Sequence, residues 1–265
     1  QRRAAAALES EVVAACASAD QQIDLVARVN ALRAAAGAKP AWLFAAAPTA
    51  LQWAARHERL GGDLAAARAS YQAWLELAPR RHPDRALMVK EQGGLAAERR
   101  LRAAGLASPG PGWMVWELRA VALPGGPAAA AAIWVRADCR AIAPGEASSA
   151  VVLYDLGAGD GRGRKLGTDV VLTDALLSFA PERPAADLTG TGVPVLVLRA
   201  AAGGQCWGCN RLRLLRADGN GLAELDLGAD PQVVPFAVAD VSADGRLAVI
   251  ASDARWEGFV GLCPS

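Results

Sequence analysis

Apolar residues in the first half of the chain recur at the three- and four-residue spacing of an α-helix. Between residues 4 and 107, Leu8, Val12 and Cys16 form one such series. Gly37 and Pro40 interrupt the pattern, as expected where a helix ends. The first half is therefore predicted to be helical.

Prolines and glycines divide the rest of this half into further helices. Pro48 is expected to begin a helix, and the segment 61–63, Gly-Gly-Asp, to form the turn into the next one, which ends at Pro79. Pro83 opens a last helical stretch, and we expect the pair at 93–94, Gly-Gly, to break it.

Beyond residue 112 the pattern changes to short extended runs separated by Gly, Pro, Asp and Asn. The predicted strands are residues 113–123, 130–142, 150–156, 193–200, 211–216, 233–241 and 246–252. The chain is thus predicted to be an α+β protein with a helical domain (1–107), a Pro/Gly-rich linker (108–112) and an all-β domain (113–265). A partial propeller or a sandwich is the expected form of the β domain.

One helical segment resembles the second helix of a tetratricopeptide repeat. It has a glycine at the turn (Gly62), a small residue (Ala67), an aromatic residue one turn later (Tyr71) and a terminating proline (Pro79). Together with the preceding helix, the resemblance covers about residues 48–79. It implies a peptide-binding groove, and the alternative is a hairpin that only packs on its neighbour.

In the second half, segments 187–198 and 240–251 echo each other and resemble the loop and strand of FG-GAP or VCBS-type repeats. In that family the loop often holds calcium through oxygens at alternate positions. The resemblance implies Asp240, Ser242 and Asp244 as metal ligands and calcium as the one cofactor candidate. The alternative is a structural turn, since each loop lacks the later acidic residue.

A whole propeller of such repeats needs more chain than this domain has. About 150 residues are present, whereas four to eight blades of roughly 40–50 residues are typical. An incomplete propeller leaves open sheet edges, which invite pairing with another chain. This favours an interaction role.

The segment 151–161 resembles the first motif of S-adenosylmethionine-dependent methyltransferases. Gly157 and Gly159 would form its glycine loop, and Asp174 would end the ribose-binding strand. That fold needs a helix in a crossover of a dozen or more residues, and only residues 162–169 are available. A glycine-rich hairpin is the alternative that we favour.

The five cysteines suggest an oxidising compartment. Cys206 and Cys209 have the spacing of a redox dithiol or half a zinc site, but we interpret them, with Cys263, as candidates for a structural disulfide. A start at Gln1 also fits a mature exported form. A bacterial periplasmic or extracellular location is therefore expected.

Charge and hydropathy exclude two classes of partner. With 28 Lys and Arg against 27 Asp and Glu, the chain lacks the basic excess of a nucleic-acid-binding protein. Its apolar stretches are interrupted by charges, so no membrane span is expected. Arg99, Arg100 and Arg102 are interpreted as a solvated helix face.

Two histidines and no Gly-x-Ser-x-Gly turn leave little for hydrolytic catalysis. The sequence therefore favours a non-catalytic, exported scaffold or accessory subunit that binds a protein partner or a larger assembly. Two alternatives stay open: a methyltransferase and a calcium-stabilised extracellular ligand-binding module.

Overall fold

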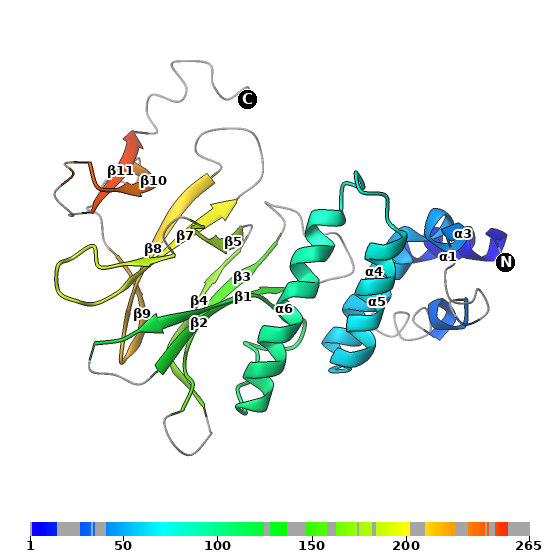
Figure 1. Ribbon diagram of the computed structural model, residues 1–265, viewed down its shortest axis with the longest axis horizontal. Coiled ribbons are helices and arrows are strands. Elements are labelled where there is room, and N and C mark those ends of the chain that lie inside the picture. The colour runs from blue at the N-terminus through cyan, green and yellow to red at the C-terminus, as the bar shows by residue number, and fades with distance from the viewer. Residues whose placement is uncertain are drawn as a thin grey trace. The chain divides into compact units, whose positions relative to one another are not determined.

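The protein has an α+β architecture in which a helical region precedes antiparallel β-sheets (Figure 1). The computed structural model describes residues 2–14, 27–32, 34, 41–124, 128–136, 147–157, 163–173, 175–181, 184–201, 210–225, 233–241, 243 and 247–253. The chain divides into two compact units. The first, the helical unit, is Gln1–Arg99 with Pro111–Met114 and Ala137–Ile142; the second, the β unit, is Arg100–Gly110, Val115–Arg136 and Ala143–Ser265.

Most of the first half is helical, as predicted. The helices are α1 (Arg2–Ala14), α3 (Ala41–Ala46), α4 (Pro48–Leu60), α5 (Leu64–Leu77) and α6 (Arg85–Ala103), and residues 27–32 are helical as well.

Helices α4 and α5 form a hairpin with the boundaries that the sequence predicts. Pro48 starts α4, where its missing N–H leaves no helix hydrogen bond unmade. Asp63 caps α5 by accepting a hydrogen bond from the backbone N–H of Ala66 at 2.9 Å. Ala67 and Tyr71 are fully buried, and the small side chain of Ala67 lets the two helices approach closely.

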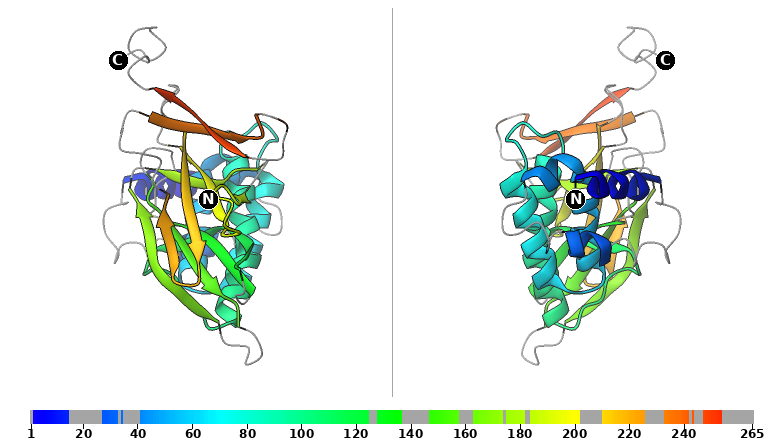
Figure 2. Two further views of the ribbon diagram at one scale, coloured as in Figure 1. Left: turned by 90° about the vertical axis from the view of Figure 1, so that its left-hand side faces the viewer. Right: turned by 90° about the vertical axis from the view of Figure 1, so that its right-hand side faces the viewer.

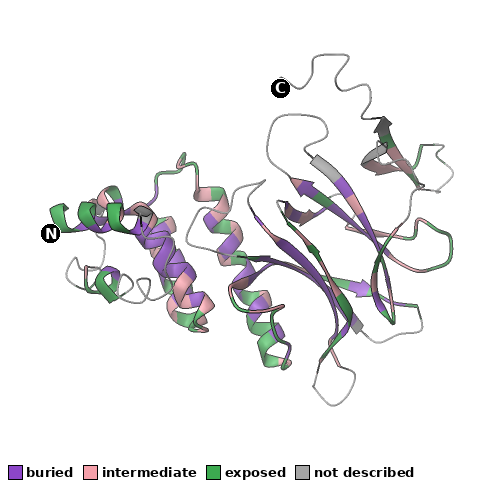
Figure 3. Ribbon diagram, turned by 180° about the vertical axis from the view of Figure 1, so that it is seen from behind, coloured by how far each residue is buried: buried purple, intermediate pink, exposed green. Residues whose placement is uncertain are grey.

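An aromatic cluster closes the open end of this hairpin. Trp74 lies edge-on to Phe44 and to His82, with ring centroids 5.2 and 5.0 Å apart. Its indole Nε1 donates to the carbonyl oxygen of Pro48 at 3.1 Å, so the buried ring has no unmet donor. Helix α4 is buried along most of its length (Figure 3).

Helix α6 runs unbroken through Gly93 and Gly94, so the expected break there is wrong. Side-chain contacts with α4 and α5 on both sides of the pair, at Glu91 and Glu98, hold the helix and outweigh the low helix propensity of glycine.

The β unit contains two open sheets and a hairpin. One sheet has the order β1 (Trp113–Ala122), β2 (Ala128–Arg136), β3 (Ser149–Asp155) and β4 (Arg164–Leu172). The second has the order β5 (Leu176–Phe179), β7 (Val195–Ala201), β8 (Asn210–Asp218) and β9 (Gly221–Glu224), with β6 (Ala185–Ala186) also paired to β7. The hairpin is β10 (Val233–Ala239) and β11 (Ala248–Asp253). The strands described form neither a closed barrel nor a propeller.

Neighbouring strands are antiparallel wherever their register is known. Every residue of β3 is buried, and it pairs with β2 through Ile133 opposite Val151. Hairpin β10–β11 lies beside β8 (Figure 2). Val238 and Val249 of this hairpin pack on the core of the second sheet.

The two sheets meet where β4 approaches β9. Gly167 and Gly221 both have positive φ, +65° and +130°. A Cβ on Gly167 would lie 2.3 Å from the carbonyl oxygen of Asn220 and 2.8 Å from the Cα of Gly221. The backbones touch at this point, and glycine is the residue type that permits it.

Candidate functional site

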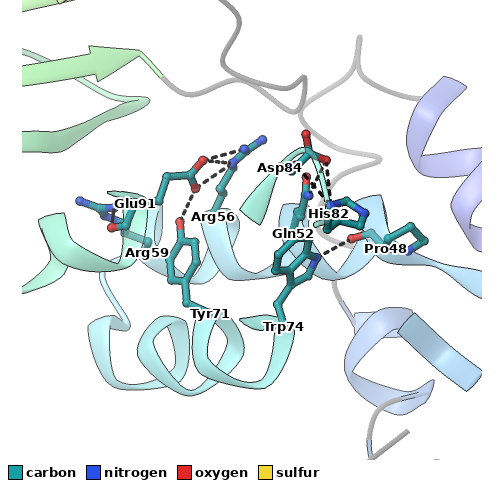
Figure 4. A network of polar contacts seen from close by, with 9 residues as sticks. All are labelled: Pro48, Gln52, Arg56, Arg59, Tyr71, Trp74, His82, Asp84 and Glu91. Atoms are coloured by element: carbon teal, nitrogen blue, oxygen red, sulfur yellow. Dashed lines mark hydrogen bonds and ion pairs between the residues drawn. The ribbon is translucent and has the colours of Figure 1, made fainter. Parts of the chain in front are cut away.

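A buried polar network joins α4, α5 and α6 within the helical unit (Figure 4). The carboxylate of Glu91 accepts hydrogen bonds from Arg56 Nε, at 3.0 and 3.1 Å, and from Arg56 Nη2 at 2.7 Å. The hydroxyl of Tyr71 donates to the same carboxylate at 2.8 Å. One carboxylate of α6 thus accepts hydrogen bonds from both helices of the hairpin.

A second ion pair lies nearly two turns further along α6. Arg59 Nε donates to Glu98 at 2.7 Å, and its Nη1 donates to the backbone carbonyl of Glu91 at 2.6 Å. Both side chains are almost completely buried. Since Arg56 and Arg59 of α4 pair in sequence order with Glu91 and Glu98, α6 runs parallel to α4.

Each buried charge in this network meets an opposite charge. Burial alone would lower the pKa of Arg56, but the charge of Glu91 and its hydrogen bonds outweigh that effect and raise it. Arg56 is therefore a permanent cation facing Glu91. We interpret the network as the support that fixes α6 beside the hairpin.

The chain has two tyrosines, Tyr71 and Tyr154, and both are buried. Burial and then the charge of Glu91 raise the pKa of Tyr71 well above 10.0. Burial and the nearby Asp169 raise that of Tyr154, whose hydroxyl donates to the carbonyl of Ala107.

We therefore expect neither tyrosine to ionise in the folded chain as pH rises through about 10. Above that pH the tyrosines of the unfolded chain lose protons that the folded chain keeps. Their contribution to the free energy of unfolding is therefore fully present below about pH 10 and is lost as pH rises further. Tyrosinate absorbance should appear together with the loss of circular dichroism. An ordinary titration near pH 10 with unchanged dichroism would contradict this prediction.

A groove of about 830 Å³ opens between α5 and α6, entirely within the helical unit. It is lined by Leu64, Ala65, Arg68, Val89, Gln92, Gly93, Leu95, Ala96 and Arg99. Its volume falls within the range of ligand sites in proteins. We call this feature the α5–α6 groove, and it is the candidate functional site.

Two features of α6 leave the groove without a covering from the described chain. Val89 is 52% exposed, one of three large apolar side chains that are exposed among the described residues. A Cβ added at Gly93 would meet nothing within 4 Å. Gly93 thus leaves helix backbone open to the groove, although an alanine side chain at that position would meet no close neighbour in the described chain.

The groove carries positive charge. Arg68 of α5 and Arg99 of α6 are exposed, and none of the lining residues is acidic. The nearby carboxylates of Glu91 and Glu98 are already bound by Arg56 and Arg59. The groove therefore offers an apolar floor and two guanidinium groups to a ligand.

The loops singled out for calcium are described in part. In the first, the Asp187 carboxylate accepts from the backbone N–H groups of Thr189, Gly190 and Gly192 at 3.1, 2.8 and 2.8 Å. The bond from Gly192, followed by that from Thr189, holds the pKa of Asp187 below its usual value. This geometry is that of a structural turn before β7.

In the second loop, Asp240 is exposed, whereas Ser242 and Asp244 lie outside the described residues. Within the described part of the chain, no three His, Cys, Asp or Glu side chains are grouped to hold a metal ion. The disulfide candidates Cys206, Cys209 and Cys263 also lie outside the described residues.

The segment that resembles a methyltransferase motif forms an antiparallel pair of strands. β3 leads to β4, its direct neighbour, with Asp155 opposite Arg164. The Asp155 carboxylate accepts from the backbone of Gly157 and pairs with Arg164 at 3.2 Å. Gly159 and Asp174 lie outside the described residues. An antiparallel pair has no parallel crossover of the kind that the motif requires.

The α5–α6 groove was not predicted from the sequence. Arg99 was expected on a solvated helix face, and the structure shows that this exposed arginine also lines the groove. The one available signal was glycine in the middle of a helix, beside an apolar residue at Val89, and it was interpreted as a break.

The chain matches no family model, no curated protein and no solved structure. None of the helices described is both long enough and apolar enough to span a bilayer.

Proposed function

We propose that the protein is a non-catalytic scaffold or accessory subunit whose helical unit binds a segment of a partner protein in the α5–α6 groove. The observation that carries the proposal is the groove itself, which combines apolar lining, an exposed valine and two arginines. Exposed apolar surface bordered by polar groups is typical of protein interaction sites.

The arrangement of helices supports the same proposal. Three consecutive helices in which the third runs parallel to the first agree with the repeat-like character expected for residues 48–79. The buried ion pairs keep α6 in place, so the groove is formed before a partner arrives and binding needs little reorganisation. Export to the periplasm or the extracellular space, expected from the cysteine content, is part of the proposal.

Charge reversal at the groove tests the proposal. The full chain, tagged and isolated from its native source, is expected to retain a stoichiometric companion protein. Arg99→Glu should reduce its recovery about tenfold, because the arginine faces the partner. Arg100→Glu is the matched control, since this neighbour on α6 is exposed but does not line the groove. Equal recovery with both variants, or no companion with the unaltered chain, would contradict the proposal.

A further inference from the structure

Resting on the proposed function, we propose that the occupant of the α5–α6 groove is an amphipathic α-helix of the partner that bears acidic side chains beside its apolar face. Three features of the groove support this choice: its length, its exposed backbone and its charge.

The length of the groove suits a short helix. On α6 the lining residues extend from Val89 to Arg99 at positions that share one helix face. At 1.5 Å per residue this face is about 15 Å long, or nearly three turns. Apolar side chains three and four residues apart on a partner helix would contact such a face along its whole length.

The bare backbone at Gly93 allows the partner to approach closely. Ala65 and Ala96 are also small, so the helix axes can come nearer to each other than long side chains would permit. Val89 adds apolar area that a partner's larger side chains would cover. Small residues alone would not define a site, but here they line a groove that already exists.

The charge of the groove determines which side chains flank the apolar face of the occupant. Arg68 and Arg99 come from the two different walls, and no lining carboxylate opposes them. A carboxylate accepts two parallel hydrogen bonds from a guanidinium, a geometry that a lysine cannot reproduce. Asp or Glu on both sides of the helix would pair with the two walls, and a basic helix would be repelled.

Selection from a peptide library tests the occupant directly. The full chain is used to select from displayed random peptides about 16 residues long, enough for roughly four helical turns. We expect the enriched peptides to carry apolar residues at helical spacing and an excess of Asp and Glu. A synthetic copy should become helical on binding and bind Arg68→Glu and Arg99→Glu about tenfold more weakly. Arg80→Glu and Arg100→Glu, outside the groove, should bind it unchanged.

The possible outcomes distinguish the proposal of an acidic helical occupant from the proposal that the groove binds a partner. Enriched peptides that are basic or extended, yet depend on Arg99, would overturn the acidic helix and leave the proposed function in place. Binding that is independent of both arginines, or no enrichment, would overturn both proposals. Circular dichroism of each variant serves as the folding control, and we expect unchanged spectra because the substituted side chains are exposed.

Substitutions at Gly93 are expected to change stability and peptide binding in opposite directions, which a purely structural role would not do. Gly93→Ala is expected to raise the midpoint of thermal unfolding, because alanine favours the helix interior and meets no neighbour there. The same change should weaken binding of the selected peptide, and Gly93→Leu should abolish it. Stronger folding with unchanged binding in both variants would contradict close approach at Gly93.

Discussion

Glu91→Gln is expected to lower the free energy of unfolding of the helical unit by about 3–5 kcal/mol. The substitution keeps the size of the side chain but removes the charge that faces Arg56. Arg56 is 3% exposed and cannot turn to water, so its cation stays buried after losing the carboxylate that it pairs with. Chemical denaturation of the full chain, followed by helical circular dichroism, measures the loss.

Two further variants identify the cause. Glu11→Gln removes a carboxylate whose ion pair with Arg28 is about half exposed, and little change is expected. Adding Arg56→Met to Glu91→Gln should restore part of the stability, since the stranded cation is gone. A double variant less stable than Glu91→Gln alone would contradict this explanation.

Gly167→Ala is expected to destabilise the β unit by about 3 kcal/mol or more, through steric overlap and backbone strain together. The new Cβ would lie within 2.3 Å of the Asn220 carbonyl oxygen, and backbone cannot move aside as a side chain can. The positive φ adds strain of about 1–3 kcal/mol. Thermal unfolding of the full chain, compared with the unaltered protein, measures the effect.

Two other glycines serve as matched controls for the two contributions. Gly190 has a φ of +69° but open space around it, so Gly190→Ala shows the strain alone. Gly219 has neither a close neighbour nor a positive φ, so Gly219→Ala should change stability little. Equal losses at 167 and 190 would show that the sheets do not meet as closely as described.

Local signals in the sequence predicted the helical hairpin well. Pro48, Asp63 and Pro79 act within one turn of the chain, so their effects on helix ends can be predicted without knowledge of the fold. Strands were likewise expected at β1, β2, β3, β7, β8, β10 and β11, with ends that differ by one or two residues. Residues 137–142, predicted as the end of β2, lie outside the described residues.

The strands that were missed depend on contacts elsewhere in the chain. β4 contains charges and a glycine, and its half-exposed pattern has weak alternation. It is a strand because it pairs with the buried β3 and because Gly167 meets Gly221, 54 positions later. β5, β6 and β9 are too short, at four, two and four residues, to give a periodic signal.

The groove and its supporting network could not be predicted for a similar reason. Arg56 and Glu91 are 35 residues apart in the sequence. Arginine and glutamate are usually exposed, so their residue types do not predict that they are buried. These charges form ion pairs that hold α6 beside the hairpin only because α6 packs parallel to α4. Because this packing holds α6 together, the helix continues through Gly93, and the missing side chain exposes the backbone there.

Site-specific photo-crosslinking tests the central claim most directly. A photoreactive amino acid replaces Val89 in the groove or, as control, Val171 on β4; these valines are 52% and 53% exposed. In the native source we predict a discrete crosslinked product from position 89 that is lost with Arg99→Glu and kept with Arg100→Glu. A product from position 171 alone, or equal products from both positions, would contradict the claim that the α5–α6 groove binds the partner.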